Sequence, residues 1–111
     1  MHNLNEKVIT IKESARIKDA LKLIDSNSEG LLFVVDNKNK LIGALSDGDI
    51  RRALISGKSL VDTIDDIYNK NPFYIFNDEY NEEYVKEVMV KNRYEVVPII
   101  NSSFFIAKIV L

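Results

Sequence analysis

The chain has 111 residues, 46% of them hydrophobic, and its 15 basic and 17 acidic side chains leave a formal net charge of -2. This size predicts one compact unit or two very small ones, and the balanced charge gives no support for nucleic-acid binding. The absence of cysteine excludes disulfides and cysteine chemistry, and a single histidine, His2, argues against a histidine metal site. The sequence has no apolar run long enough to cross a membrane and no signal peptide, so we expect a cytoplasmic protein.

The first half of the chain predicts strands and helices that alternate. In chain order they are an extended piece at residues 8–11, a helix at 17–26, strands at 31–36 and 41–46, a helix at 47–55 and a short helix at 60–69. In the first helix, Ile17, Ala20, Leu21 and Ile24 recur at the spacing of one helical face. The link between the two strands, "NKNK", is rich in turn formers, which predicts a hairpin.

The second half repeats this order in an ungapped alignment that places Ile9 opposite Phe73 and Leu21 opposite Val85. It predicts an extended piece at 73–76, a helix at 82–92 and strands at 95–100 and 104–110. The alignment ends at Leu111, opposite Asp47, so the second copy lacks a last helix. We therefore divide the chain into residues 1–59 and 60–111, and we expect the native protein to continue past Leu111 into the missing helix.

Residues 43–49, "GALSDGD", join a strand to a helix with small and acidic side chains. Gly43 leaves room for another backbone or a flat ligand, and Ser46 with Asp49 has the spacing of a capping box. A helix N-terminus favours phosphate, and a carboxylate can accept two hydrogen bonds from a ribose diol. Residues 43–52 therefore have two possible roles. They could form a helix cap followed by solvent-exposed Arg51 and Arg52, or they could form a nucleotide-binding site.

A β-α-β-β-α unit present twice resembles the paired cystathionine-β-synthase (CBS) domains. The spacing of Gly43, Ser46 and Asp49 is similar to the ribose and phosphate motif of that family. The longer stretch at residues 46–54, "SDGDIRRAL", resembles CBS pairs attached to sugar-phosphate nucleotidyltransferases and sugar-phosphate isomerases. The resemblance implies an α/β (α+β) fold of two repeats related by a pseudo-two-fold axis, the second without its last helix.

The same resemblance implies a regulatory module with no catalytic or metal-binding residue of its own. It would bind a nucleotide effector (AMP, ADP, ATP or a cytidine nucleotide), require no cofactor, form a homodimer and modulate an attached C-terminal catalytic domain, expected to be a nucleotidyltransferase. The residues that it assigns to the ligand are Gly43, Ser46, Asp47, Asp49, Thr10, Arg51 and Arg52.

We expect one ligand per chain, because the ungapped alignment places Ala107 and Val110 opposite Gly43 and Ser46. Two alternatives stay open. The pair could be a dimerisation module with a vestigial site, or it could belong to an isomerase that senses a nucleotide sugar.

Overall fold

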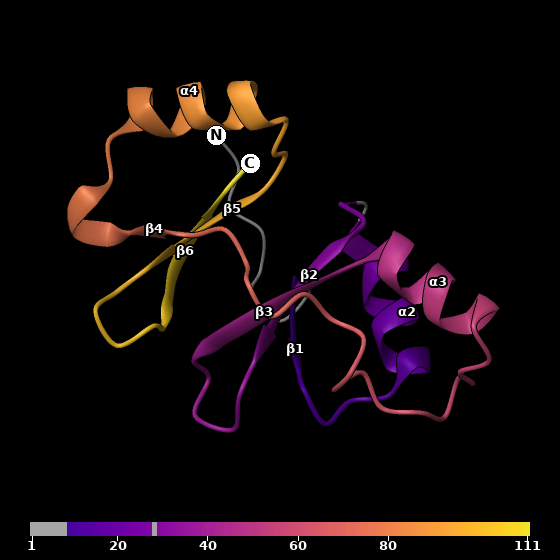
Figure 1. Cartoon of the computed structure of the whole chain (residues 1–111). Helices are drawn as coiled ribbons and strands as arrows, with labels where there is room; N and C mark the ends of the chain where they lie inside the picture. Colours follow the sequence, from indigo (N-terminus) through magenta and orange to yellow (C-terminus); the bar gives the residue numbers. More distant parts are fainter. Residues whose placement is uncertain (1–8, 28) are drawn as a thin grey trace.

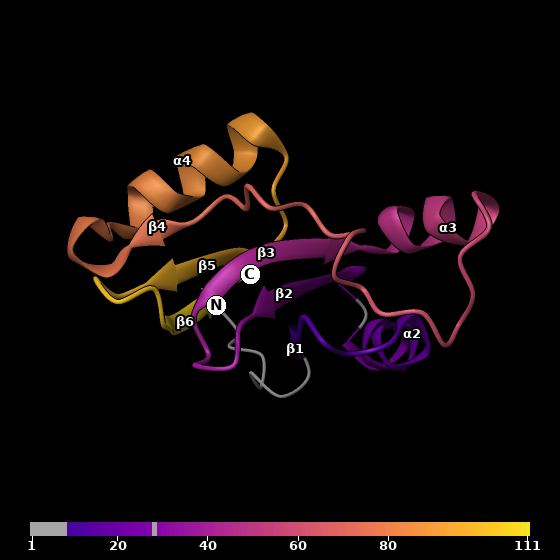
Figure 2. The same ribbon diagram turned by 60° about the horizontal axis from the view of Figure 1, so that its bottom comes forward.

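The computed structural model describes residues 9–27 and 29–111, which form two halves with one three-stranded sheet each. His2 and Val8 lie outside the described residues. The first half lies at the lower right of Figure 1 and the second at the upper left, and the helices lie on the outer sides of the two sheets. Figure 2 shows strands of both halves meeting in the middle of the molecule. The predicted α+β fold with two related halves is confirmed.

The first sheet has the order β1-β2-β3. Its strands are β1 (Thr10–Lys12), β2 (Leu31–Val35) and β3 (Leu41–Ser46). β1 runs parallel to β2, and β2 pairs with β3 in an antiparallel hairpin. Two helices follow strands in this half, α2 (Ile17–Asn27) and α3 (Asp47–Ile55), so the predicted elements are present with small changes at their ends.

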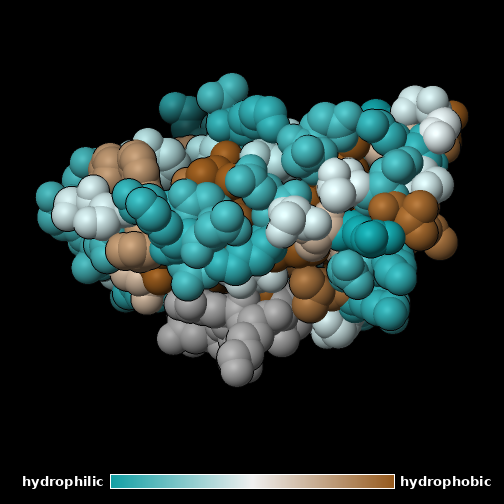
Figure 3. Space-filling view, turned by 90° about the horizontal axis from the view of Figure 1, so that it is seen from below, coloured by the Kyte–Doolittle hydropathy of each residue, from teal (hydrophilic) through white to brown (hydrophobic). Residues whose placement is uncertain are grey.

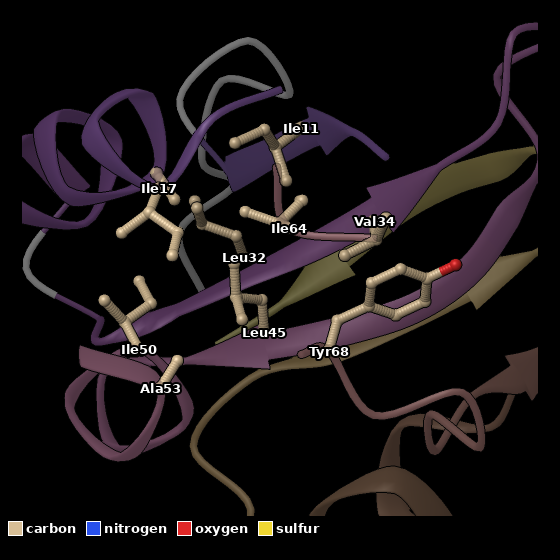
Figure 4. Close-up of a cluster of buried hydrophobic side chains, with 10 residues drawn as sticks. Ile11, Ile17, Leu32, Val34, Leu45, Ile50, Ala53, Ile64 and Tyr68 are labelled. Carbon is tan, nitrogen blue, oxygen red and sulfur yellow. The ribbon is translucent and has the colours of Figure 1, made fainter. Parts of the chain in front are cut away.

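One face of this sheet packs against α2 and α3 to form the first core. Figure 4 shows Leu32 and Leu45 on the strands, directed toward Ile17 of α2 and Ile50 of α3. The four side chains are fully buried. The other buried members of the first core are Ile11, Ala20, Val34, Ala53, Ile64 and Tyr68.

The short helix predicted for residues 60–69 is wrong: this segment is a series of turns that packs on the first half. Its backbone groups bond to the first half, with Ile17 N–H donating to the Asp62 carbonyl (2.9 Å) and Ile64 N–H to the Ala15 carbonyl (3.0 Å). The apolar positions that fit a helix, such as Ile64 and Tyr68, enter the first core instead. Although we placed the division of the chain at residues 59 and 60, the chain leaves the first half only after Asn69.

The second sheet has the order β4-β5-β6, with the same parallel and antiparallel pairings. Its elements are β4 (Ile75–Phe76), the 3-10 turn η1 (Asn77–Glu79), α4 (Glu82–Asn92), β5 (Val97–Ile100) and β6 (Ile106–Val110). Val85 of α4 packs with Val97, Ile99, Val110 and Ile75 in a second core. Among the described residues, one α-helix covers this sheet, where two cover the first.

The pairing registers correct the predicted alignment of the two halves. Leu32 pairs with Leu45 in the first hairpin, and Val97 pairs with Val110 in the second, so Leu32 corresponds to Val97 and not to the predicted Val96. The starts of α2 and α4 fit the same corrected alignment. The strands β1 and β4 keep the predicted alignment. Ile11 pairs with Val34, and Ile75 pairs with Ile99. Because Val34 corresponds to Ile99 in the corrected alignment, Ile11 corresponds to Ile75, as predicted. One residue is therefore inserted between the first strand and the helix of the second half, which sequence periodicity did not reveal.

The inner faces of the two sheets meet in an interface cluster. Its buried members are Ile9, Phe33, Leu41, Val96, Ile100 and Ile109. The start of β3 also touches the second hairpin, where Leu41 N–H donates to the Phe104 carbonyl at 2.8 Å. The ring of Phe104 lies 5.5 Å from that of Tyr74 and 5.7 Å from that of Phe76. This contact fixes the two halves to each other beside the cleft described below.

No helix within residues 9–27 and 29–111 is long and apolar enough to cross a membrane. On the face shown in Figure 3, hydrophobic atoms form separate small patches between hydrophilic ones.

Candidate functional site

A cleft of about 450 Å³ lies between the two halves. The first half contributes Leu31, Phe33 and Ala44, and the second contributes Tyr94 and Val96. The segment that connects the halves supplies the remaining lining residues, Asn69, Asn71, Pro72 and Phe73. The lining is apolar, aromatic and amide in character and contains no acidic or basic side chain. Such a surface suits a flat, uncharged group.

Strand register places Ser46 at the edge of this cleft. Phe33 pairs with Ala44, and Leu31 pairs with Ser46 two residues further along β3. Because side chains alternate along a strand, Ala44 and Ser46 share a face with Leu31 and Phe33. That face lines the cleft, and the opposite face carries the first core. Ser46 therefore continues the cleft wall up to the start of α3.

Ser46 and Asp49 form the predicted capping box at the start of α3. The Asp49 backbone N–H donates to Ser46 Oγ at 3.0 Å, and the Ser46 backbone N–H donates to Asp49 Oδ2 at 3.0 Å. These two bonds satisfy two of the N–H groups at the start of the helix and hold the Asp49 side chain against Ser46. The capping reading of this motif is confirmed, and it fixes the carboxylate near the cleft edge.

Two exposed ion pairs lie on the first turns of α3. Arg52 Nη2 donates to Asp49 Oδ1 at 2.8 Å, and Arg51 Nη2 donates to Asp47 Oδ2 at 2.6 Å. The two arginine side chains are 72% and 65% exposed, so the pairs add little to folding stability. Asp47 lies on a separate groove with Leu21 and Ile24 of α2, so it borders the helix surface rather than the cleft.

Gly43 faces the first core, and its missing side chain serves the packing of Tyr68. A Cβ atom at Gly43 would overlap the Tyr68 ring and lie 2.7 Å from the Asn69 carbonyl oxygen. Ala44 and Asn69 exchange two backbone hydrogen bonds, of 2.9 and 2.8 Å. The close approach expected at Gly43 is therefore made by the connecting segment, which in turn positions Asn69 and its neighbours on the cleft wall.

The wall opposite the first half is a stacked aromatic pair, made by Phe73 of the connecting segment and Tyr94 of the second half. The rings of Phe73 and Tyr94 lie 4.7 Å apart at 28° to each other. On the connecting segment, Asn69 Oδ1 accepts from the Asn71 N–H at 3.0 Å, which shapes the turn before Phe73. An offset aromatic surface of this kind is suited to stacking with another ring.

Of the seven residues assigned from the sequence, the structure brings Ser46 and Asp49 together near the cleft. Thr10 pairs with Phe33 from β1 and shares its face, one strand further from the cleft. Sequence reasoning missed the wall made by Asn71, Phe73 and Tyr94. The pair Asn71-Pro72 marked a boundary between the copies, but no periodic pattern predicts that Phe73 and Tyr94 stack.

Tyr68 is the titratable side chain next to Gly43. Burial raises the pKa of its phenol, and the hydroxyl donates to Glu13 Oε2 at 3.2 Å. Lys70 Nζ lies 4.0 Å from the centre of the same ring. These contacts hold Tyr68 as a structural residue under the connecting segment.

A larger depression, of about 550 Å³, lies at the end of β4. It is lined by Phe76, Asn77, Asp78, Glu79, Asn101 and Ser102. Most of these side chains are exposed, and they all come from the second half. Within the part of the chain that the structure describes, no group of three or more acidic or histidine side chains is placed to hold a metal ion. The smaller cleft is the better candidate, because both halves line it and strand β3 leads from it to the capped start of α3.

The second half has no equivalent of the capping motif. In the corrected alignment, Lys108 occupies the position of Gly43 and Leu111 that of Ser46, in place of the Ala107 and Val110 predicted above. Lys108 Nζ lies 3.6 Å from the centre of the Tyr80 ring. A lysine and a leucine at these positions give neither the hydroxyl nor the open backbone of the first half.

Comparisons with known proteins agree with this fold. Residues 3–56 match the CBS domain family model. The protein MJ1232 of Methanocaldococcus jannaschii is 42% identical over 55 residues, which are 50% of this chain and 18% of that protein. A second protein of that organism, MJ1225, is 28% identical over 98 residues, or 88% of this chain and 35% of its own length. The chain thus spans well under half the length of these relatives.

Solved structures extend the match to both halves. The CBS domains of a transcriptional regulator from Streptococcus pneumoniae give a TM-score of 0.79 at 21% identity, covering 97% of this chain and 87% of that one. The CBS domain pair of protein MJ0100, in complex with 5′-methylthioadenosine and S-adenosyl-L-methionine, gives 0.73 at 26% identity, with 92% and 82% coverage. Protein PAE2072 of Pyrobaculum aerophilum, complexed with AMP, gives 0.74 at 18% identity, with 95% and 84% coverage. The first half therefore matches the CBS domain family, and the whole chain has the fold of a CBS domain pair.

Proposed function

We propose that this CBS pair is a regulatory module that binds an adenine nucleotide in the cleft between its halves. The observation that carries the proposal is the cleft itself: its wall is uncharged and partly aromatic, and strand β3 leads from it to the capped N-terminus of α3. The adenine ligands of the MJ0100 pair, which is 26% identical, support an adenine base over a cytidine base. Binding would favour one arrangement of the two halves and so influence an attached domain.

The proposal gives each part of the cleft a role. The base lies between the apolar wall of Leu31 and Ala44 and the stacked pair of Phe73 and Tyr94. The ribose diol donates to the Asp49 carboxylate, whose Oδ2 accepts from the Ser46 N–H and whose Oδ1 accepts from Arg52 in the absence of ligand. The phosphate lies toward Ser46, Arg51 and Arg52, where the positive end of the helix dipole adds to their charge.

Isothermal titration of the chain with AMP, ADP, ATP, S-adenosylmethionine and CMP tests this function. Asp49→Ala should weaken the tightest ligand at least about tenfold, because hydrogen bonds to a charged group contribute roughly 1.5–3 kcal/mol each. Asp49→Asn is the matched variant: its amide oxygen can still accept from the Ser46 N–H, so the cap survives while the charge is lost. If no nucleotide binds the wild-type chain, or if folded Asp49→Ala binds unchanged, the proposal fails.

The second half motivates a stoichiometry of one nucleotide per chain. Lys108 and Leu111 replace the glycine and serine of the motif, and Lys108 covers Tyr80. The same titration should therefore give one site per chain. Two equivalent sites would contradict the assignment of the ligand to the Ser46 and Asp49 half.

The attached enzyme remains part of the proposal. The stretch "SDGDIRRAL" supports a sugar-phosphate nucleotidyltransferase, with a sugar-phosphate isomerase as the alternative. The relatives MJ1232 and MJ1225 are much longer than the matched region, which leaves space in them for further domains. The coding sequence that adjoins residue 111 tests this directly: it should encode a helix with apolar residues at i, i+3 and i+4, followed by a catalytic domain.

We also propose that the chain forms a homodimer through the α2 and α3 surface. A groove of about 400 Å³ lies there, lined by half-buried Leu21 and Ile24 and bordered by side chains of both charges, Lys22, Asp25 and Asp47. A two-fold axis would bring the lysine of one copy to the carboxylates of the other. Sedimentation velocity should show a dimer at micromolar concentration that Ile24→Glu dissociates, while the exposed control Val90→Glu on α4 should leave it intact.

A further inference from the structure

The cleft lining poses a problem of selectivity. None of the residues that line it carries an acidic or basic side chain, so the lining itself cannot distinguish a nucleotide from the nucleoside without phosphate. That distinction has to come from charged groups at the cleft edge. The described basic side chains next to Ser46 and Asp49 on α3 are those of Arg51 and Arg52.

The two arginines have different partners, and this separates their roles. Arg51 bonds to Asp47, which borders the groove between α2 and α3. Arg52 bonds to Oδ1 of Asp49, the carboxylate whose other oxygen is held by the Ser46 N–H. Arg52 reaches back across Gly48, and a Cβ atom there would lie 3.2 Å from Arg52 Nη1. The absence of a side chain at Gly48 leaves the space that the guanidinium occupies.

We propose that Arg52 is the residue that makes this site select phosphorylated nucleosides. In the empty site it bonds to Asp49 Oδ1 and so occupies an acceptor that the ribose diol requires. When the diol takes Asp49, the guanidinium is released and pairs with the phosphate, to which its planar fork can donate two hydrogen bonds. A ligand without phosphate breaks the ion pair and gains no new partner for Arg52. This inference rests on the proposed function.

The proposal predicts that one substitution acts with opposite sign on two ligands. Arg52→Ala removes the competitor of the ribose, so adenosine should bind about twofold to fivefold more tightly, the range expected for loss of an exposed ion pair. AMP loses the cation that pairs with its phosphate and should bind about fivefold to twentyfold more weakly. The preference for AMP over adenosine should therefore fall at least tenfold. A residue with only a structural role would shift both affinities in the same direction.

Isothermal titration with AMP and with adenosine, at two salt concentrations, tests the inference. Lys86→Ala is the matched control, because it removes one basic side chain from an exposed ion pair with Glu82 on the distant helix α4. It should leave both affinities unchanged. Arg52→Lys keeps the charge without the planar fork and should give an intermediate preference for AMP. Thermal melting confirms that each variant is folded.

The outcomes separate this inference from the proposed function. If the wild-type chain binds neither ligand, the proposed function fails and this inference fails with it. If the wild type binds AMP but Arg52→Ala weakens AMP and adenosine equally, or changes neither, Arg52 does not select for phosphate although the site stands. If Lys86→Ala reproduces the effect of Arg52→Ala, the effect comes from net charge, and the inference is overturned.

Discussion

The two halves of the molecule share one scaffold but differ at the end of their last strand. Their hairpins have the same register, including the irregularity before the turn, and α2 and α4 begin at equivalent positions. In the first half, Gly43 admits the connecting segment, and Ser46 caps a second helix. In the second half, Lys108 takes the position of the glycine and lies over Tyr80. The shared backbone alone therefore does not create a binding site. The candidate site depends on a few residues that only the first half has, such as Gly43 and Ser46.

The two hairpin turns also share a backbone conformation but differ in the side chain that adopts it. Asn39 and Phe104 occupy equivalent positions, and both have φ of 67°. Asparagine tolerates this left-handed conformation, whereas a bulky aromatic residue is strained there. In the second hairpin the strain is offset by the contacts of Phe104 with Tyr74, Phe76 and the Leu41 N–H. The second hairpin thus keeps a strained turn residue whose contacts join the halves.

The largest effect should follow from adding a side chain at position 43. Gly43→Ala places a methyl group against the Asn69 carbonyl and the Tyr68 ring, so the connecting segment must move. Forcing an extra carbon into a packed site typically destabilises a protein by about 1–3 kcal/mol, and we expect the upper end because a backbone atom is in the way. Urea denaturation measures the loss of folding stability in Gly43→Ala. A loss below about 0.5 kcal/mol would mean that Tyr68 and Asn69 can move away at little cost.

The second effect concerns Phe104. Phe104→Ala should destabilise the chain by about 2 kcal/mol, because a half-buried aromatic cluster loses one ring. Phe104→Gly removes the same ring but releases the left-handed strain, so it should be as stable as Phe104→Ala or up to about 1 kcal/mol more stable. Asn39→Ala should likewise be less stable than Asn39→Gly, because residue 39 has the same left-handed conformation. If Phe104→Ala is clearly more stable than Phe104→Gly, backbone strain at this turn is negligible.

Lys108 should give a smaller effect. Lys108→Met keeps most of the side-chain stem but removes the charge above Tyr80. A cation–π contact contributes about 0.5–1 kcal/mol at exposed sites, and we expect a value of this size for this half-buried pair. The matched variant Lys108→Ala removes the stem as well and should lose slightly more. Chemical denaturation at low and high salt measures both. An unchanged midpoint for Lys108→Met would show that the lysine over Tyr80 is only a surface arrangement.

The sequence predicted the repeat, the order of the elements and the capping box, because these depend on local spacing and on residue types at helix starts. It predicted neither the turns at residues 60–69 nor the wall made by Phe73 and Tyr94. Ile64 and Tyr68 have helical spacing, but the backbone of their segment bonds to Ala15 and Ala44 instead of forming a helix. The inserted residue between β4 and α4 was missed because apolar patterns in the two halves still overlap when the alignment moves by one position. Contacts between distant segments leave no periodic signal in a single sequence.

The smallest effect should appear in the pH dependence of the first hairpin. The Lys40 backbone N–H donates to the Asp36 carboxylate and holds its pKa below the ordinary value of 3.8. Asn101 makes the equivalent bonds, to Ser103 and Phe105, with an amide that does not titrate. Because the folded pKa of Asp36 is lowered, its contribution to stability is present above pH 3.8 and is lost as the pH falls through the folded pKa.

Asp36→Asn should therefore lower stability slightly at pH 7 and reduce the further loss as the pH falls below 3.8, where the native carboxylate takes up its proton. The reverse change, Asn101→Asp, should add a loss of stability over the same range. Urea midpoints measured for the three proteins at each pH compare the two turns directly. If Asp36→Asn leaves the acid-induced loss unchanged, ionisation of Asp36 does not contribute to the stability of the first hairpin.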